Sequence, residues 1–188
     1  MVIEIRDAVP SDAGPIADAQ VTAWRVAYRP FFPASYLDSE TFATTRRTNW
    51  LRWVTDRPAG TALYVPVVDG RVVGFAHAGP ERATAGAAAP NADATHGGGG
   101  GEVYAFYLHP DAWGSGAATG LMEACIAHLV AGGFADACLW VLRDNARARA
   151  FYEKAGWHAA GCDMPWTPSD APDLTVVETR YARALPAA

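Results

Sequence analysis

The chain has 188 residues, of which 51% are hydrophobic and 19% charged, so it is long enough to bury a core and too apolar to be disordered. Its net charge of −5 argues against a dedicated nucleic-acid binder, because such proteins are usually basic. The first residues lack the layout of a secretory signal and no apolar run reaches the length of a membrane span, so we expect a cytoplasmic protein without a membrane partner.

The N-terminal third is predicted to be one strand followed by helices. Alternating apolar and charged residues predict a strand over 2–6. Helical spacing then predicts a helix with Ser11 as its N-cap that ends before Pro30, since proline disfavours helix in the residue before it. Helical spacing returns over 35–56.

Aromatic residues crowd this part of the chain, and most of them are expected to form core and inter-helix contacts. Trp24 and Tyr28 lie one helical turn apart and share a face, which makes them the first candidates for lining a substrate pocket.

The middle of the chain predicts a hairpin and a loop. Two β-rich runs, 61–68 and 71–78, flank Asp69-Gly70, which is a strong hairpin signal. Residues 80–101 are dominated by Ala, Gly, Pro and Asn and end in five glycines, so they predict a flexible surface loop. The glycine run lacks the Lys-Ser/Thr ending of a phosphate-binding P-loop.

A strand, a glycine turn and a helix follow one another after this loop. The strand is predicted over 102–109 and the helix over 115–131, with Gly114 and Gly116 in the turn between them. Free N–H groups at the start of a helix suit a phosphate group. A dinucleotide-binding G-x-G-x-x-G pattern would need glycine where Thr119 stands.

The rest of the chain predicts a strand over 137–142, a helix over 145–155, and two strands over 157–162 and 174–181. The first of these strands follows the helix over 115–131, so the strand–helix–strand order implies a parallel pair with a crossover. We find no second domain, so 1–188 is predicted to be a single domain.

Two motifs now combine. The first is Leu108-His109-Pro110 followed by Trp113-Gly114-Ser115-Gly116-Ala117-Ala118, and the second is Asn145, Ala148, Phe151-Tyr152 and Gly156-Trp157. Together they resemble the GCN5-related N-acetyltransferase (GNAT) family, which moves an acetyl group from acetyl-CoA to an amine. The resemblance implies the GNAT acyl-CoA N-acyltransferase fold of the α/β (α+β) class. In that fold a mixed, mostly antiparallel sheet has a splayed central parallel strand pair and is flanked by helices.

One position departs from the family pattern. Trp113 stands where the family usually has Arg or Gln, which removes one side-chain donor near the phosphates. The indole either covers the CoA or packs on the surface. Because the pyrophosphate is held mainly by main-chain N–H groups in this family, the resemblance stands.

The resemblance implies a set of residues that bind acetyl-CoA. Main-chain N–H groups of Gly114, Ser115, Gly116, Ala117 and Ala118 would hold the pyrophosphate. The end of the strand, at Tyr107, Leu108 and His109, would pair with the pantetheine arm as an added strand does.

The helix over 145–155 carries the other expected cofactor residues. Asn145 and Tyr152 are seven residues apart and share a helix face, where small Ala148 leaves room for the CoA tail. Asn145 can bond an amide of that tail. The resemblance further implies that Tyr152 protonates the departing thiolate, for which a phenol of pKa about 10 is a suitable acid. The alternative role for Tyr152 is packing.

The amine must lose a proton, and Glu102 at the start of the central strand is the first candidate base, with an exposed strand-edge acid as the alternative role. His77 and His109 are further candidates. Tyr104 shares a strand face with Glu102 and is expected to line the amine site, as His77 is.

We expect direct transfer in a ternary complex with a small-molecule or peptide amine. Cys125 and Cys138 lie in apolar patterns without an adjacent base, and no CxxC pair or metal site is expected. A homodimer would be in keeping with proteins that resemble this one. The alternative function is a non-catalytic acyl-CoA-binding or regulatory protein of the same fold.

Overall fold

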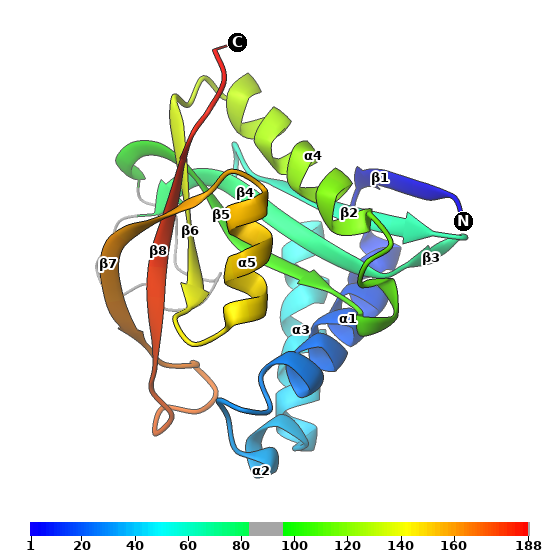
Figure 1. Cartoon of the computed structure of the whole chain (residues 1–188). Coiled ribbons are helices and arrows are strands. Elements are labelled where there is room, and N and C mark those ends of the chain that lie inside the picture. Colours follow the sequence, from blue (N-terminus) through cyan, green and yellow to red (C-terminus); the bar gives the residue numbers. More distant parts are fainter. Residues whose placement is uncertain (83–95, 188) are drawn as a thin grey trace. The chain divides into compact units, whose positions relative to one another are not determined.

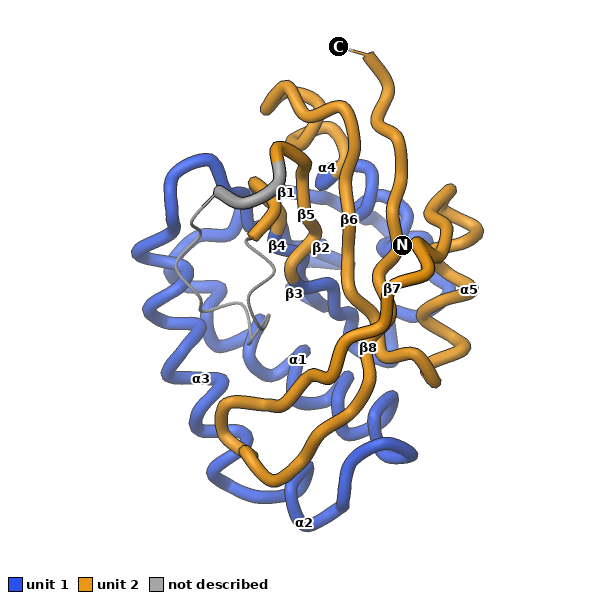
Figure 2. The backbone as a smooth tube through the Cα atoms, turned by 90° about the vertical axis from the view of Figure 1, so that its left-hand side faces the viewer, with its two compact units in different colours: residues 1–77, 105–125 blue, residues 78–104, 126–188 orange. Residues whose placement is uncertain are grey.

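A computed structural model describes residues 1–82 and 96–187. The chain forms two compact units, each made of two segments (Figure 2). The first unit contains Met1–His77 and Ala105–Cys125, and the second contains Ala78–Tyr104 and the chain from Ile126 onward. That residues 1–188 form a single domain remains a prediction, which this division into two units does not test.

Helices and strands alternate irregularly along the chain (Figure 1). In order, they are β1 (Ile3–Asp7), the 3₁₀ turn η1 (Pro10–Asp12), α1 (Ala13–Ala27), α2 (Ala34–Leu37), α3 (Glu40–Thr55), β2 (Ala62–Val68), β3 (Arg71–Val72), β4 (Gly74–Arg82), β5 (His96–Leu108), the 3₁₀ turn η2 (Pro110–Ala112), α4 (Ala117–Ala131), β6 (Asp136–Leu142), α5 (Ala146–Lys154), β7 (His158–Trp166) and β8 (Val176–Ala184). The division between the two units falls within β4, β5 and α4.

Strand pairing confirms the predicted fold class. The strand order is β1-β2-β4-β5-β6-β8-β7, with β3 paired to β2. The pairs β1–β2, β6–β8 and β7–β8 are antiparallel. Strands β5 and β6 are parallel, and their register joins Gly101, Glu102 and Val103 to Ala137, Cys138 and Leu139. Strand β5 continues past this register to Leu108.

The Asp69-Gly70 hairpin is confirmed. Val68 pairs with Arg71 across the turn, and Asp69 and Gly70 have φ values of 45° and 81°. A two-residue turn with positive φ at both positions has the twist that antiparallel strands need. The strand predicted over 71–78 is interrupted at Val73 and is therefore divided into β3 and β4. The N–H group of Val73 donates to the carbonyl of Pro66 at 3.0 Å.

The first unit is built on a core between its strands and the helices α1 and α3. Ile16 and Ala17 of α1, Trp50 of α3, and Val65 and Phe75 of the strands are buried in one apolar cluster. The start of α4 lies near β1 instead, because a Cβ added at Gly120 would come within 3.3 Å of Ile5. Burial of these apolar side chains is the main source of stability in this unit.

Two helix starts differ from the prediction. Ser11 lies within η1, and the residue before α1 is Asp12, whose carboxylate accepts hydrogen bonds from Val9 N and from Arg6. The helical run over 35–56 is divided into α2 and α3, because the Ser39 hydroxyl caps α3 by accepting from the N–H of Phe42 at 3.1 Å. The side-chain cap of Ser39 decided the start of α3, whereas the hydrogen bonds that Asp12 accepts from Arg6 and Val9 N hold the residue before α1.

The loop predicted over 80–101 is shorter than expected. Strand β4 continues to Arg82 and β5 begins at His96, while residues 83–95 lie outside the described part of the chain. Close packing explains why glycines stand in β5. A Cβ at Gly100 would lie 2.7 Å from Asp136 Oδ1, and one at Gly101 would lie 2.8 Å from the Leu129 side chain.

The C-terminal strands β7 and β8 extend beyond the ranges predicted for them, 157–162 and 174–181, and Pro165 of β7 pairs with Val177 of β8. None of the helices within the described ranges is long and apolar enough to cross a membrane.

Gly74 provides a test of close packing in the first unit. A Cβ there would overlap the carbonyl oxygen of Tyr107 and lie 3.0 Å from Leu108 Cα, and neither main-chain group moves easily. We expect Gly74→Ala to lower the free energy of unfolding by about 1–3 kcal/mol in urea titrations.

Gly14→Ala is the matched control for this variant. Gly14 is exposed in α1 and has no atom within 4 Å of the added Cβ, so its replacement should be neutral or stabilise by up to about 1 kcal/mol. Equal effects at the two positions would contradict the packing argument.

Candidate active site

The glycine turn lies in the first unit, between η2 and α4. Gly114 and Gly116 have φ values of 78° and 96°, a conformation that side chains disfavour. The Ser115 hydroxyl donates to the carbonyl of Ala112 at 2.7 Å and accepts from the N–H of Ala117 at 3.2 Å. The turn is therefore held in shape by its own hydroxyl group.

Three N–H groups of this turn have no acceptor in the described parts of the chain: those of Gly114, Gly116 and Ala118. By contrast, Ser115 N donates to the carbonyl of Ala112, and Ala117 N donates to the hydroxyl group already described. Unused N–H groups at the start of a 15-residue helix are donors for an anion.

Trp113 closes the turn onto the end of β5. Its indole Nε1 donates to the carbonyl of Leu108 at 3.1 Å, so packing on the strand end accounts for this side chain. Two of the main-chain groups predicted to pair with pantetheine thus have partners within the unit, because His109 N also donates to the carbonyl of Val73 at 2.7 Å. The His109 ring accepts a hydrogen bond from Asp111 N at 3.2 Å through Nδ1.

Asn145, Ala148 and Tyr152 belong to the second unit. Asn145 caps α5, because its side-chain oxygen accepts from the N–H of Ala148 at 3.2 Å, and its NH₂ group is not used in this cap. Tyr152 is 8% exposed, and its ring lies 6.3 Å from that of Tyr181. The predicted cofactor residues are therefore divided, with the glycine turn in one unit and α5 in the other.

Glu102 is a buried charge rather than an exposed strand-edge acid, since it is 2% exposed. Its carboxylate accepts from Arg82 N at 2.9 Å and from Arg82 Nε at 3.1 Å, and it also contacts the terminal guanidinium nitrogen. Burial opposes the positive charge of Arg82, but the hydrogen bonds to Glu102 outweigh it and raise the guanidinium pKa.

Tyr104 completes this side of the second unit. Its hydroxyl donates to the carbonyl of Pro80, and the Arg82 guanidinium lies 4.8 Å from the centre of its ring. Burial, and next the charge of Glu102, raise the Tyr104 pKa well above its ordinary value. The phenol therefore stays neutral and is held beside the ion pair.

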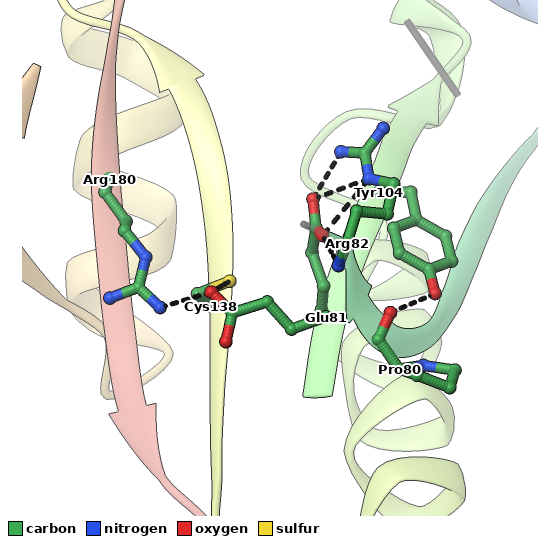
Figure 3. A network of polar contacts seen from close by, with 7 residues as sticks. Pro80, Glu81, Arg82, Tyr104, Cys138 and Arg180 are labelled. Carbon is green, nitrogen blue, oxygen red and sulfur yellow. Dashed lines mark hydrogen bonds and ion pairs between the residues drawn. The ribbon is translucent and has the colours of Figure 1, made fainter. Parts of the chain in front are cut away.

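A second ion pair lies next to the first (Figure 3). Arg180 of β8 donates to Glu81 Oε1 at 2.7 Å, and the Cys138 thiol lies 3.4 Å from the same oxygen. Burial opposes the charge of Arg180, but its hydrogen bond to Glu81 helps to raise its pKa.

Glu178 is a member of this polar group that the sequence did not single out. It is half-buried on β8, and burial raises its carboxyl pKa to about 7; the Arg82 charge lowers that pKa and the Glu102 charge raises it. The only sequence signal was one acidic residue inside an apolar run, Val176-Val177-Glu178-Thr179.

The predicted substrate residues Trp24 and Tyr28 meet Tyr107 in the first unit. The rings of Trp24 and Tyr28 are 4.7 Å apart, and Tyr107 lies 6.2 Å and 6.3 Å from them. Trp24 is 4% exposed, so it belongs to the core, whereas Tyr28 is half-buried. His77 is 2% exposed and its ring lies 5.5 Å from Trp53.

Two of the three cysteines are buried and the third, Cys162, is exposed. Burial raises the Cys125 pKa to about 12, and burial together with the charges of Glu102 and Glu81 raises that of Cys138 still further. Both buried groups are therefore neutral thiols, which are poor nucleophiles. Over the described ranges, no three His, Cys, Asp or Glu side chains gather as a metal site would require.

Comparison with known proteins places the chain in a family. A model described as the Acetyltransferase (GNAT) family matches residues 21–157, and the chain belongs to this family. The resemblance inferred from the two motifs is thereby confirmed. The N-acetyltransferase YuaI of Bacillus subtilis is 25% identical over 194 residues, covering 97% of this chain and 100% of YuaI.

Two further matches add a local and a structural likeness. The mycothiol acetyltransferase of Geodermatophilus obscurus is 36% identical over 66 residues, which cover 35% of this chain and 21% of that protein. The crystal structure of the PaiA N-acetyltransferase from Thermoplasma acidophilum, in complex with coenzyme A, matches with a TM-score of 0.70 at 16% identity. That match covers 98% of this chain and 99% of that one, and it supports the fold.

The Arg82–Glu102 pair yields a stability test. Removing one partner leaves a buried charge without compensation, so we expect Arg82→Met to lower the free energy of unfolding by about 3–5 kcal/mol at neutral pH. The double variant Arg82→Met/Glu102→Gln should recover most of that loss. Urea titrations of the wild type, both single variants and the double variant form a double-mutant cycle. If the losses of unfolding free energy in the two single variants simply add up in the double variant, the coupling between Arg82 and Glu102 is contradicted.

Proposed function

We propose that this chain is an N-acetyltransferase that moves an acetyl group from acetyl-CoA to a primary amine by direct transfer in a ternary complex. The observation that carries the proposal is the glycine turn, with its three available N–H groups, in a member of the GNAT family. A pyrophosphate is the kind of anion that such a turn binds.

The remaining cofactor contacts follow from the same proposal. Tyr107, Leu108 and His109 are the proposed main-chain contacts of the pantetheine arm, with the Leu108 carbonyl and the His109 N–H group already bonded within the unit. The NH₂ group of Asn145 is available to an amide oxygen of that arm. Ala148 presents only a methyl group, which leaves room for the CoA tail.

The reaction needs one proton removed and one supplied. The amine nitrogen attacks the thioester carbonyl carbon, the C–S bond breaks, and the thiolate takes a proton from the Tyr152 hydroxyl. The products are an N-acetyl amide and the free thiol of CoA. The nitrogen loses its proton to a base, for which Glu102 was the first candidate. The Glu102 carboxylate already accepts hydrogen bonds from three N–H groups of Arg82.

The acceptor is proposed to be a small-molecule or peptide amine. The predicted acceptor residues Trp24, Tyr28 and Tyr104 carry aromatic rings, which suit a cationic amine. Incubating the purified protein with acetyl-CoA and a panel of primary amines, with a thiol reagent as the readout, tests the activity. Tight CoA binding without thiol release for any amine would favour a non-catalytic CoA-binding protein instead.

Tyr152→Phe tests the proposed acid. We expect it to lower kcat by about 100-fold, because a positioned general acid contributes on that scale, while the Kd for CoA stays close to that of the wild type. Tyr64→Phe, at a half-buried position on β2, is the matched control and should leave kcat unchanged. Wild-type kcat in Tyr152→Phe would remove Tyr152 from the chemistry.

Replacing the two buried thiols tests direct transfer. Because Cys125 and Cys138 are held as neutral thiols, the double variant Cys125→Ala/Cys138→Ala should keep close to wild-type kcat and form no acetylated protein on mixing with acetyl-CoA. Mass spectrometry of the wild-type protein after the same mixing gives the second readout. An acetylated cysteine that turns over with amine would contradict direct transfer.

A further inference from the structure

Glu178 lies on β8 of the second unit between two apolar neighbours. The register pairs it with Leu142 of β6 on one side and with Met164 of β7 on the other. Its carboxylate is half-buried, and no hydrogen bond reaches it from the described ranges of the chain. It is therefore a carboxylate that is partly withdrawn from water and lacks compensation.

The sheet face that carries Glu178 is the polar one. Glu178 and Arg180 alternate along β8 with Thr179 and Tyr181, so the two pairs point to opposite faces. The Tyr181 hydroxyl donates to Glu153 of α5 at 2.7 Å, which shows that α5 covers the other face. Glu178 thus shares its face with Arg180 and points away from α5.

Glu178 is a carboxylate for which the described residues on this side of the second unit supply no arginine partner. Arg82 pairs with Glu102, and Arg180 pairs with Glu81. Glu178 has no ion pair within the described residues, although the charges of Arg82 and Glu102 both act on it. A carboxylate without a partner in such surroundings is costly, so it favours the protonated form or a cation.

We propose that Glu178 accepts the proton that the ammonium group of the acceptor loses before acetyl transfer. This inference rests on the proposed function and assigns the base to Glu178 in place of Glu102, whose carboxylate is paired with Arg82. An N–H bond of the ammonium breaks and an O–H bond forms on the Glu178 carboxylate. The freed lone pair attacks the thioester carbonyl. The nitrogen then loses a second proton, which passes through water to the phenolate that Tyr152 becomes on protonating the thiolate. Glu178 returns its own proton to water after the amide has formed.

The surroundings make this proton transfer feasible. A primary ammonium has a pKa of about 10.4 in water, and burial lowers such a value by up to about 3–5 units. Burial raises the pKa of Glu178 to about 7, so the two groups approach each other in proton affinity. In a weakly polar environment the neutral pair of amine and carboxylic acid is favoured over the ion pair.

Other titratable groups lie on the elements around Glu178. They are Glu81 and Arg82 on β4, Glu102 and Tyr104 on β5, Arg143 after β6, Asp163 on β7 and Arg180 on β8. Within this group, burial raises the Tyr104 pKa further above neutrality, and the pKa values of Arg82 and Arg180 are also raised. These three groups therefore do not change charge near pH 7.

The test compares pH profiles of kcat/KM for the full chain with the best acceptor from the amine panel. Wild type should rise through an apparent pKa near 7, because Glu178 must be ionised to accept the proton. Glu178→Gln should lower kcat/KM by about 100-fold at pH 8 and lose this inflection, with partial recovery at high pH as free amine becomes abundant. Glu178→Asp should keep the inflection.

Asp163→Asn is the matched control. Asp163 lies on β7 opposite Thr179, with its side chain 47% exposed, and its profile should match wild type. Glu102→Gln distinguishes the rival base: if it removes the inflection while Glu178→Gln keeps it, the inference is overturned. If no amine releases thiol from the wild-type protein, the proposed function itself fails.

A stability measurement gives a readout that is independent of catalysis. The folded pKa of Glu178 lies above its ordinary value of 4.5, so the folded state binds more protons between these two pH values. The free energy of unfolding of wild type should therefore fall relative to Glu178→Gln as pH rises from about 4.5 to 7. A constant difference between the two proteins over this range would contradict the raised pKa on which the proton transfer depends.

Discussion

The buried ion pair between Arg82 and Glu102 is the constraint on which the polar half of this protein depends. It joins the end of β4 to β5 through hydrogen bonds from three N–H groups of Arg82, one of them in the main chain. Because Arg82 is committed to Glu102, it cannot also neutralise Glu178, and Arg180 is committed to Glu81 in the same way. Burial is the main reason why the pKa of Glu178 is raised, and the opposing charges of Arg82 and Glu102 act on it in addition.

The two units contribute different kinds of chemistry. The first offers main-chain N–H groups in a glycine turn, and these groups do not depend on which side chains stand beside them. Trp113 stands where the family usually has Arg or Gln, and its indole donates to the carbonyl of Leu108. The second unit offers side chains, and there each substitution changes a charge or a hydrogen bond directly.

Local signals predicted the elements well and their ends less well. Asp69-Gly70 specified its turn because only a few residue types accept positive φ at both positions. The five glycines at 97–101 suggested a loop, yet they enter β5, where a Cβ at Gly100 or Gly101 would press on the side chain of Asp136 or Leu129. Ser11 carried the signal of an N-cap, but Asp12 precedes α1 because the ion pair with Arg6 fixes it there. Contacts distant in sequence decided the glycine case, and an ion pair between residues six apart decided the position of Asp12.

The sequence by itself determined the family, the fold class and the identity of the glycine turn, because spaced glycines, a proline and helix periodicity act through the local backbone. It also brought Asn145, Ala148 and Tyr152 onto one short helix, with Asn145 as the cap. Only the tertiary structure decided that Glu102 is buried against Arg82, that Trp24 belongs to the core, and that Glu178 carries a raised pKa. Burial and charge pairing depend on neighbours from several strands, and a short stretch of sequence does not specify those neighbours.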